Sequence, residues 1–273
     1  MPELPEVETV RRDLHEHLLG CKILDIEIKN DACIKCPDKA AFITALQGKT
    51  FISTGREGKY LRLFLDDESI LTVHLRMTGR IIYTPAETPH REHTHIIFRL
   101  SDGAELRYSD TRRFGCLWWQ PKGEADCTGA QNLGPEPLDD NFSAGYLIKT
   151  LGKRKMPIKS AILDQRAVAG LGNIYADEVL FISGISPTRP ANELNEKEWQ
   201  ILAENMRSVL LDAIENRGTT FSDFLDGEGH IGSNQHFLRV YGKKHQPCPE
   251  CKTELQYLKV GGRGTVHCPN CQK

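Results

Sequence analysis

The residues best suited to chemistry stand at the N-terminus, in the segment Met1-Pro2-Glu3-Leu4-Pro5-Glu6-Val7-Glu8. An initiator methionine is usually removed when the next residue is small, so we expect the mature chain to begin with Pro2, whose nitrogen is then a free secondary amine. An α-amino group has a pKa of about 7.7–8.0, so much of it is neutral and nucleophilic at pH 7. Its condensation with a carbon such as a sugar C1′ would give an iminium that attracts electrons. Glu3 and Glu6 are close enough in sequence to move protons there.

The same segment has a simpler interpretation as the start of a helix. Val7, Val10, Leu14 and Leu18 recur at helical spacing, and Gly20 follows them. Acidic residues in a first turn stabilise the helix dipole, and proline is favoured at a helix start. The sequence therefore predicts an amphipathic helix over residues 5–19, which would hold the N-terminus rigidly whether or not the amine is catalytic.

A second chemical motif lies at the other end of the chain. Its spacing, Cys248-x2-Cys251-x16-Cys268-x2-Cys271, is typical of a four-cysteine zinc site. Four thiolates leave no open coordination position, so the predicted zinc ion is structural, and so short a unit needs the metal to fold. Between the cysteine pairs, residues 257–260 and 265–267 read as two strands joined by 261–264, which places Arg263 at a hairpin tip.

Residues 2–8 resemble the N-terminal signature of bacterial formamidopyrimidine-DNA glycosylase, a family that excises 8-oxoguanine and ring-opened purines, and later motifs extend the resemblance over essentially the whole chain. The resemblance implies a helix-two-turns-helix enzyme with glycosylase and abasic-site lyase activities. Pro2 would attack C1′, and Glu3 would act as the acid that promotes loss of the base. Lys59 and Arg263 would assist the β- and δ-eliminations, and no cofactor would take part in the chemistry.

The resemblance also assigns residues to DNA binding. Enzymes that act on a base within a duplex must extrude it and fill the gap. Two loops, 75–79 and 110–115, offer suitable side chains, although on composition alone the apolar ones would more often be core. By resemblance, the void-filling residues are Met77 and Phe114, the residue facing the orphaned cytosine is Arg112, and the phosphate or DNA contacts are His93, Arg154 and Asn173. Glu57 departs from the family pattern and would weaken phosphate attraction near Lys59.

Composition limits the alternatives. The 273 residues are 39% hydrophobic and 26% charged, with nine cysteines and no recognisable secretory signal or long apolar run, so we expect a cytoplasmic protein that is associated with the nucleoid when bound to DNA. The net charge is only −2. However, residues 153–166 carry five basic side chains against one acidic, and residues 237–273 carry seven against two. This segregation indicates local basic surfaces on an acidic body.

Alternating apolar residues predict strands at 24–28, 61–65, 70–75, 80–83, 95–100, 104–109 and 115–119. Residues 120–145 are rich in glycine, proline, aspartate and asparagine and end the strand pattern, and helical patterns follow them. We therefore predict an α+β multidomain fold. Its parts are an N-terminal helix and β-sandwich at 2–131, a helical helix-two-turns-helix domain at 132–218, a lesion-recognition loop at 219–236, and a zinc-finger hairpin at 237–273.

Two other functions remain open. The chain could be a zinc-finger protein that binds DNA without catalysis, with Pro2 and Glu3 merely starting a helix. It could also be an enzyme of the endonuclease VIII branch, which prefers oxidised pyrimidines, although that branch is less similar at Leu4 and Val7. For all three functions the predicted partner is double-stranded DNA. A monomer is expected, because one chain carries nucleophile, wedge and phosphate contacts.

Overall fold

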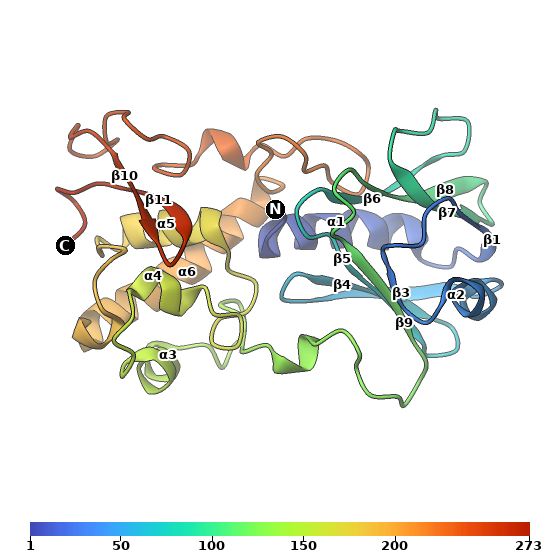
Figure 1. Cartoon of the computed structure of the whole chain (residues 1–273), viewed down its shortest axis with the longest axis horizontal. Coiled ribbons are helices and arrows are strands. Elements are labelled where there is room, and N and C mark those ends of the chain that lie inside the picture. The colour runs from blue at the N-terminus through green and yellow to red at the C-terminus, as the bar shows by residue number, and fades with distance from the viewer. The chain divides into compact units, whose positions relative to one another are not determined.

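The computed structural model describes all 273 residues, which form two compact units (Figure 1). The first unit comprises residues 1–131 and 216–235, and the second comprises residues 132–215 and 236–273. The segment 216–235 thus belongs to the first unit, although it follows the helices of the second unit in sequence.

The first unit is built from two sheets and two helices. Its four-stranded sheet has the order β1-β7-β8-β6 and its five-stranded sheet the order β2-β9-β5-β4-β3. The elements are α1 (Leu4–Leu18), β1 (Ile23–Ile28), β2 (Ile34–Cys36), α2 (Lys39–Leu46), β3 (Phe51–Glu57), β4 (Tyr60–Leu65), β5 (Ile70–His74), β6 (Gly79–Pro85), β7 (Thr94–Leu100), β8 (Ala104–Asp110) and β9 (Cys116–Gln120), followed by a 3-10 turn at Ala130–Asn132. The predicted β-sandwich is confirmed.

One hydrophobic core joins both sheets to α1, which lies alongside the strands in Figure 1. Alternation along β4 sends Leu61, Leu63 and Leu65 into this core. The apolar stripe of α1 is buried in it as the helical spacing predicted. Burial of this stripe fixes the helix that starts two residues after Pro2.

Residues 34–57 contain three elements that the sequence analysis did not predict: β2, α2 and β3. Strand β2 is only three residues long and pairs in parallel with β9, which no local pattern indicates. Helix α2 did carry a local signal, because Asp38 accepts hydrogen bonds from the backbone N–H groups of Ala40 and Ala41 as an N-cap.

The second unit contains four helices and a two-stranded hairpin. They are α3 (Ala144–Leu151), α4 (Ile158–Ile162), α5 (Asn173–Ile182), α6 (Glu196–Glu215), β10 (Gln256–Val260) and β11 (Arg263–His267), with 3-10 turns at Ala191–Glu193 and Asn234–His236. Helix α6 begins with a capping box, since Asn195 and Glu198 exchange reciprocal side-chain-to-backbone hydrogen bonds. No helix of the chain is long and apolar enough to cross a bilayer.

Candidate functional site

Pro2, Glu3 and Glu6 are all buried at the start of α1. One carboxylate oxygen of Glu6 accepts the backbone N–H of Glu3 at 2.8 Å, and the other accepts the backbone N–H of Thr219 at 2.8 Å. Glu6 therefore ties the residue after Pro2 to the beginning of the 219–236 segment. The Glu3 carboxylate in turn accepts the backbone N–H of Glu6, so the two residues form a capping box. Because Glu6 joins two segments, we infer a positioning role for it and keep Glu3 as the candidate for the acid.

Lys59 is largely buried in the two-residue turn between β3 and β4. Arg56 fastens this turn to α1, because its guanidinium donates to the carbonyl of Gly58 at 3.1 Å and to the carboxylate of Glu8 at 3.2 Å. Burial alone would raise the pKa of Glu8, but hydrogen bonds and charges from Arg11 and Arg56 hold it below its usual value. The turn that carries Lys59 and the helix that follows Pro2 are thus one rigid assembly.

The negative charge of Glu57 is locally compensated. Arg62 contacts its carboxylate at 2.5 Å and also that of Asp126 at 3.0 Å. Glu57 was expected to weaken the attraction of phosphate near Lys59. Arg62, which the sequence pattern did not single out, reduces this effect because its positive charge pairs with Glu57.

The structure brings together the two predicted void-filling residues, Met77 and Phe114, and the predicted cytosine-facing residue, Arg112. The Arg112 guanidinium donates to the Met77 sulfur at 3.1 Å and lies 4.7 Å from the centre of the Phe114 ring. Met77 is 41% exposed and Phe114 is 52% exposed. Large apolar side chains held together at a surface, outside the core, are suited to entering a base stack.

Asp110 organises these two loops and was missed in the sequence. One of its buried carboxylate oxygens accepts the Thr78 hydroxyl and the Arg112 N–H, and the other accepts the Gly115 N–H at 2.8 Å and the Tyr108 hydroxyl. Burial and the charge of Asp110 raise the pKa of Tyr108. The only feature of the sequence that could have pointed to Asp110 is its position at the end of a predicted strand, just before a loop.

His93 lies beside the same loops. Its carbonyl accepts the backbone N–H of Asp110 at 3.1 Å, and its imidazole is partly exposed. The neighbouring His95 is buried, and its Nε2 donates to the Asp110 carbonyl at 2.8 Å. Of the two histidines, His93 is therefore the one available to a ligand.

In the second unit, Arg263 is exposed at the first position of β11. The turn before it consists of Gly261 and Gly262, both in the left-handed region that favours glycine. The side-chain amide of Asn173, the first residue of α5, donates to the carbonyl of Gly264 at 3.0 Å. The Oδ1 atom of Asn173 is buried without a hydrogen-bond partner. Asn173 thus supports the hairpin that presents Arg263.

Lys159 supports the same hairpin more deeply, a role that its place in a basic cluster did not reveal. Its side chain is 0% exposed and its amine contacts the Asp177 carboxylate at 2.6 Å, the Thr265 hydroxyl at 2.8 Å and the Gly264 carbonyl at 3.1 Å. Asp177 also accepts the N–H of Val266 at 3.1 Å. Burial raises the pKa of Asp177 to about 6 in spite of the opposing charge of Lys159.

Replacement of Asp177 by asparagine should destabilise the second unit by about 3–5 kcal/mol, because it leaves the Lys159 ammonium buried without a counter-charge. The loss should appear in urea unfolding followed by the fluorescence of Trp199, which is buried in α6. The double variant Lys159→Met/Asp177→Asn removes the buried charge and should recover part of the stability. An equal loss in the single and double variants would contradict this account.

Arg154 is partly exposed and its guanidinium contacts Asp164 at 3.0 Å. Arg166 contacts the same carboxylate at 3.1 Å. Hydrogen bonds from Arg166 and Arg154 lower the pKa of Asp164 to about 2. Two guanidinium groups share one carboxylate, so this part of the basic stretch keeps a net positive charge that a phosphate could meet.

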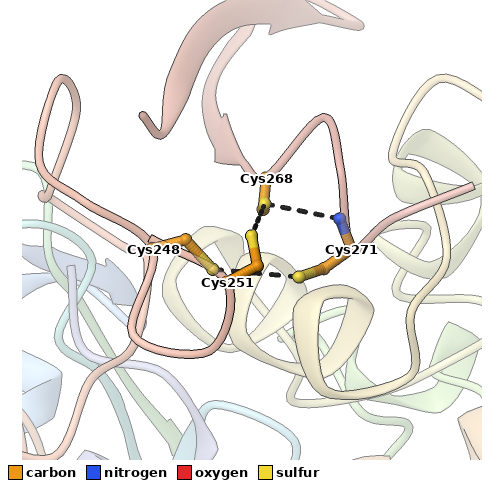
Figure 2. A group of neighbouring side chains, drawn as sticks. All are labelled: Cys248, Cys251, Cys268 and Cys271. Carbon is orange, nitrogen blue, oxygen red and sulfur yellow. Dashed lines mark hydrogen bonds between the residues drawn. The ribbon is translucent and has the colours of Figure 1, made fainter. Parts of the chain in front are cut away.

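The four predicted zinc ligands converge (Figure 2). Their sulfur atoms all lie within 4.8 Å of one another, with 3.5 Å between Cys251 and Cys268 and 3.9 Å between Cys248 and Cys271. Tetrahedral zinc with bonds of about 2.3 Å requires sulfur separations of about 3.8 Å. The backbone N–H of Cys271 also donates to the Cys268 sulfur. This donor set fits a structural zinc ion.

Comparison with known families covers most of the chain in three consecutive matches. Residues 1–117 match the N-terminal domain of formamidopyrimidine-DNA glycosylase, residues 133–224 match the H2TH domain of the same enzyme, and residues 246–273 match the zinc finger found in FPG and IleRS. The chain belongs to the formamidopyrimidine-DNA glycosylase family.

Relatives in this family are similar over their full length. The formamidopyrimidine-DNA glycosylase of Pelotomaculum thermopropionicum is 45% identical, with 100% of this chain and 99% of the relative covered. That of Moorella thermoacetica is 48% identical over 95% of each chain. Among solved structures, a Lactococcus lactis FPG mutant in complex with a Fapy-dG containing DNA has a TM-score of 0.93 at 35% identity over 100% of both chains. The MutM (FPG) protein of Thermus thermophilus has a TM-score of 0.89 at 36% identity, covering 99% of this chain and 98% of that one.

Proposed function

We propose that this chain is a bifunctional DNA glycosylase and abasic-site lyase of base-excision repair, which removes 8-oxoguanine and formamidopyrimidines from duplex DNA. The observation that carries this proposal is the full-length similarity to family members, one of them bound to Fapy-dG containing DNA. The residues expected to carry out the chemistry and to fill the gap in the duplex are all present, and Arg112 contacts both Met77 and Phe114.

The proposed reaction begins with the free nitrogen of Pro2. It forms a bond to C1′ of the extruded nucleotide while the bond between C1′ and the base breaks, and the proton that the amine loses balances the one that the departing base gains. Glu3 donates a proton to the ring oxygen O4′, the C1′–O4′ bond breaks, and the opened sugar is held to Pro2 as an iminium. The iminium acidifies C2′, so loss of a C2′ proton expels the 3′ phosphate by β-elimination. Loss of a C4′ proton in a second elimination breaks the C5′–O bond and releases the 5′ phosphate.

The remaining residues position DNA for these steps. Lys59 is fixed to α1 through Arg56 and Glu8, which favours a phosphate contact and assistance to β-elimination. Arg263, on the hairpin held by Asn173 and Lys159, is the candidate to assist δ-elimination. The proposed DNA contacts are His93, Arg112, Arg154 and Asn173, with Met77 and Phe114 filling the gap left by the base.

We assign the four cysteines one structural zinc ion, which supplies no chemistry and stabilises the end of β11.

The chain is proposed to act as a monomer in the cytoplasm, at the nucleoid when bound to DNA. A dimer in sedimentation at micromolar concentration would contradict the monomer.

Borohydride trapping tests the function directly. The processed, zinc-loaded chain is mixed with a duplex containing 8-oxoguanine opposite cytosine, reduced, digested and analysed by mass spectrometry. We expect a DNA adduct on the N-terminal peptide at Pro2. A parallel reaction uses a duplex that contains an oxidised pyrimidine. An adduct only with an oxidised-pyrimidine duplex would overturn the substrate assignment. No adduct with either of these two duplexes, while DNA binding persists, would favour a binding protein without catalysis.

A further inference from the structure

The segment 216–235 is attached to α1 at two levels. Glu6, in the first turn of the helix, holds the N–H of Thr219. Asp13, seven residues later and largely buried, lies on the same face, because seven residues are about two helical turns. No part of the proposed reaction uses Asp13, which makes its buried charge a feature that needs an explanation.

Asp13 is the centre of a charged cluster that we call the loop clamp, formed by Asp13, Arg217 and Asp226. One terminal nitrogen of Arg217 lies 2.9 Å from both carboxylate oxygens of Asp13 and 2.5 Å from Asp226. The Arg217 Nε also donates to Asp226 at 3.2 Å. The clamp therefore links α1 to both the beginning and the middle of the segment.

The two carboxylates of the clamp also bind backbone. Asp13 accepts the N–H of Gly227 at 3.0 Å, while Asp226, which is fully buried, accepts the N–H groups of Glu228 at 3.1 Å and His230 at 2.8 Å. Hydrogen bonds to ionised carboxylates are stronger than those between neutral groups. The clamp thereby sets the backbone path of residues 226–230 as well as joining side chains.

Local backbone geometry shows that this arrangement is enforced. Arg217 has a φ of +57°, a left-handed conformation that costs energy for a residue other than glycine. At Gly227 any Cβ would lie 2.8 Å from the Cβ of Asp13, so the segment approaches the helix more closely than a side chain would permit. The carbonyl of Gly227 accepts the N–H of Tyr83 at 2.8 Å, which holds it from the other side. Strain of this kind persists where surrounding contacts overdetermine it.

The clamp attaches Arg217 and residues 226–227 of the segment to α1, and two large apolar side chains elsewhere in the segment are exposed to solvent. Phe221 is 56% exposed and Ile231 is 67% exposed. Apolar side chains on a braced loop are suited to contact with the flat face of an extruded base. A duplex that already lacks the base offers them nothing to cover.

We propose that Asp13, Arg217 and Asp226 are positioning residues for excision of an intact damaged base, and that they are dispensable for strand cleavage at a preformed abasic site. This inference rests on the proposed function and deepens it. The clamp holds the 216–235 segment against α1, whereas the proposed lyase steps depend on Pro2 and the residues fixed around Lys59.

The test compares two rates for each variant: single-turnover excision of 8-oxoguanine, and cleavage of a duplex with a preformed abasic site. Asp13→Ala and Arg217→Ala should each slow base excision about tenfold, since small misplacements are costly in catalysis. Cleavage at the abasic site should stay within about twofold of the unmodified chain, because the segment has no base to hold there. The double variant should be no slower than either single variant, because residues of one network are not additive.

Conservative variants separate charge from bulk. Arg217→Lys keeps the positive charge and should recover part of the excision rate, and Asp13→Asn, which can still accept the Gly227 N–H, should be less impaired than Asp13→Ala. Glu16→Ala is the matched control, because Glu16 is an exposed acidic residue on the same helix and should leave both rates unchanged.

Each outcome has a definite meaning. Equal losses in excision and abasic-site cleavage would indicate a general structural defect and overturn the clamp, as would unchanged excision in all clamp variants. If the unmodified chain neither excises 8-oxoguanine nor cleaves the abasic duplex, the proposed function itself fails. The two failures are therefore distinguishable.

Discussion

A chain whose Pro2 nitrogen is held in an amide bond should lose lyase activity by about a thousandfold or more, because loss of a nucleophile removes the covalent step entirely. An N-terminal extension that cannot be removed creates this state without altering any side chain. The expected result is no borohydride-trapped adduct and no strand cleavage at an abasic site, measured under single-turnover conditions.

The control for this experiment is the same extension with a protease site that leaves Pro2 as the first residue. Cleavage should restore both adduct and strand scission. DNA affinity, measured by fluorescence anisotropy, is expected to fall much less than activity, since the predicted phosphate contacts lie elsewhere in the chain. Full lyase activity in the blocked chain would rule out Pro2 as the nucleophile and direct attention to another amine, with Lys59 the first to test.

The helix that holds Pro2 could be predicted from sequence, whereas the burial of Pro2 is seen only in the structure. The apolar stripe of α1 and the four-cysteine spacing are local patterns, and the structure confirms the helix and brings the four sulfurs together. The hairpin of β10 and β11 was also visible, because Gly261-Gly262 between two alternating runs is a strong turn signal.

Residues that act through long-range partners were not visible in the same way. Asp110 organises two loops that are 32 residues apart in sequence, and Lys159 meets a hairpin 105 residues away. Asp13 lies on the predicted polar side of an amphipathic pattern, yet it is buried by a segment more than 200 residues later. The sequence shows that these side chains are charged. It does not show which distant residues pair with them and offset the free-energy cost of burying the charge.

Charge provides a related example. The net charge of −2 argues weakly against DNA binding, whereas individual pairings decide which cations remain available. Arg62 neutralises Glu57 near Lys59, and Asp164 accepts two guanidinium groups near Arg154. The sequence predicts where basic residues cluster. To identify a DNA-binding surface from these clusters, each basic side chain that already pairs with a carboxylate has to be counted together with that carboxylate.

Replacement of Cys268 by serine should release the metal and weaken DNA binding by at least about tenfold, because metal binding supplies about 10–16 kcal/mol to the folding of small zinc units. Cys268 is fully buried directly after β11, and it packs with Leu255 and Val266 in a small core whose other members include the zinc ligands. Without the fourth thiolate the end of β11 loses its anchor, and the hairpin that presents Arg263 should become mobile.

Zinc content per chain, measured by atomic absorption, and affinity for an abasic-site duplex check this result. Cys127→Ser is the matched control, since Cys127 is an exposed thiol outside the cluster and should keep one zinc ion and full affinity. The hydrogen bonds from Lys159 and Asn173 to Gly264 and Thr265 do not involve the metal. Helices α4 and α5 should therefore stay folded, and the circular dichroism spectrum should change little. Retention of zinc and of DNA affinity by Cys268→Ser would refute the four-cysteine site. Loss of zinc with unchanged DNA affinity would show that the hydrogen bonds from Lys159 and Asn173 alone suffice to present Arg263.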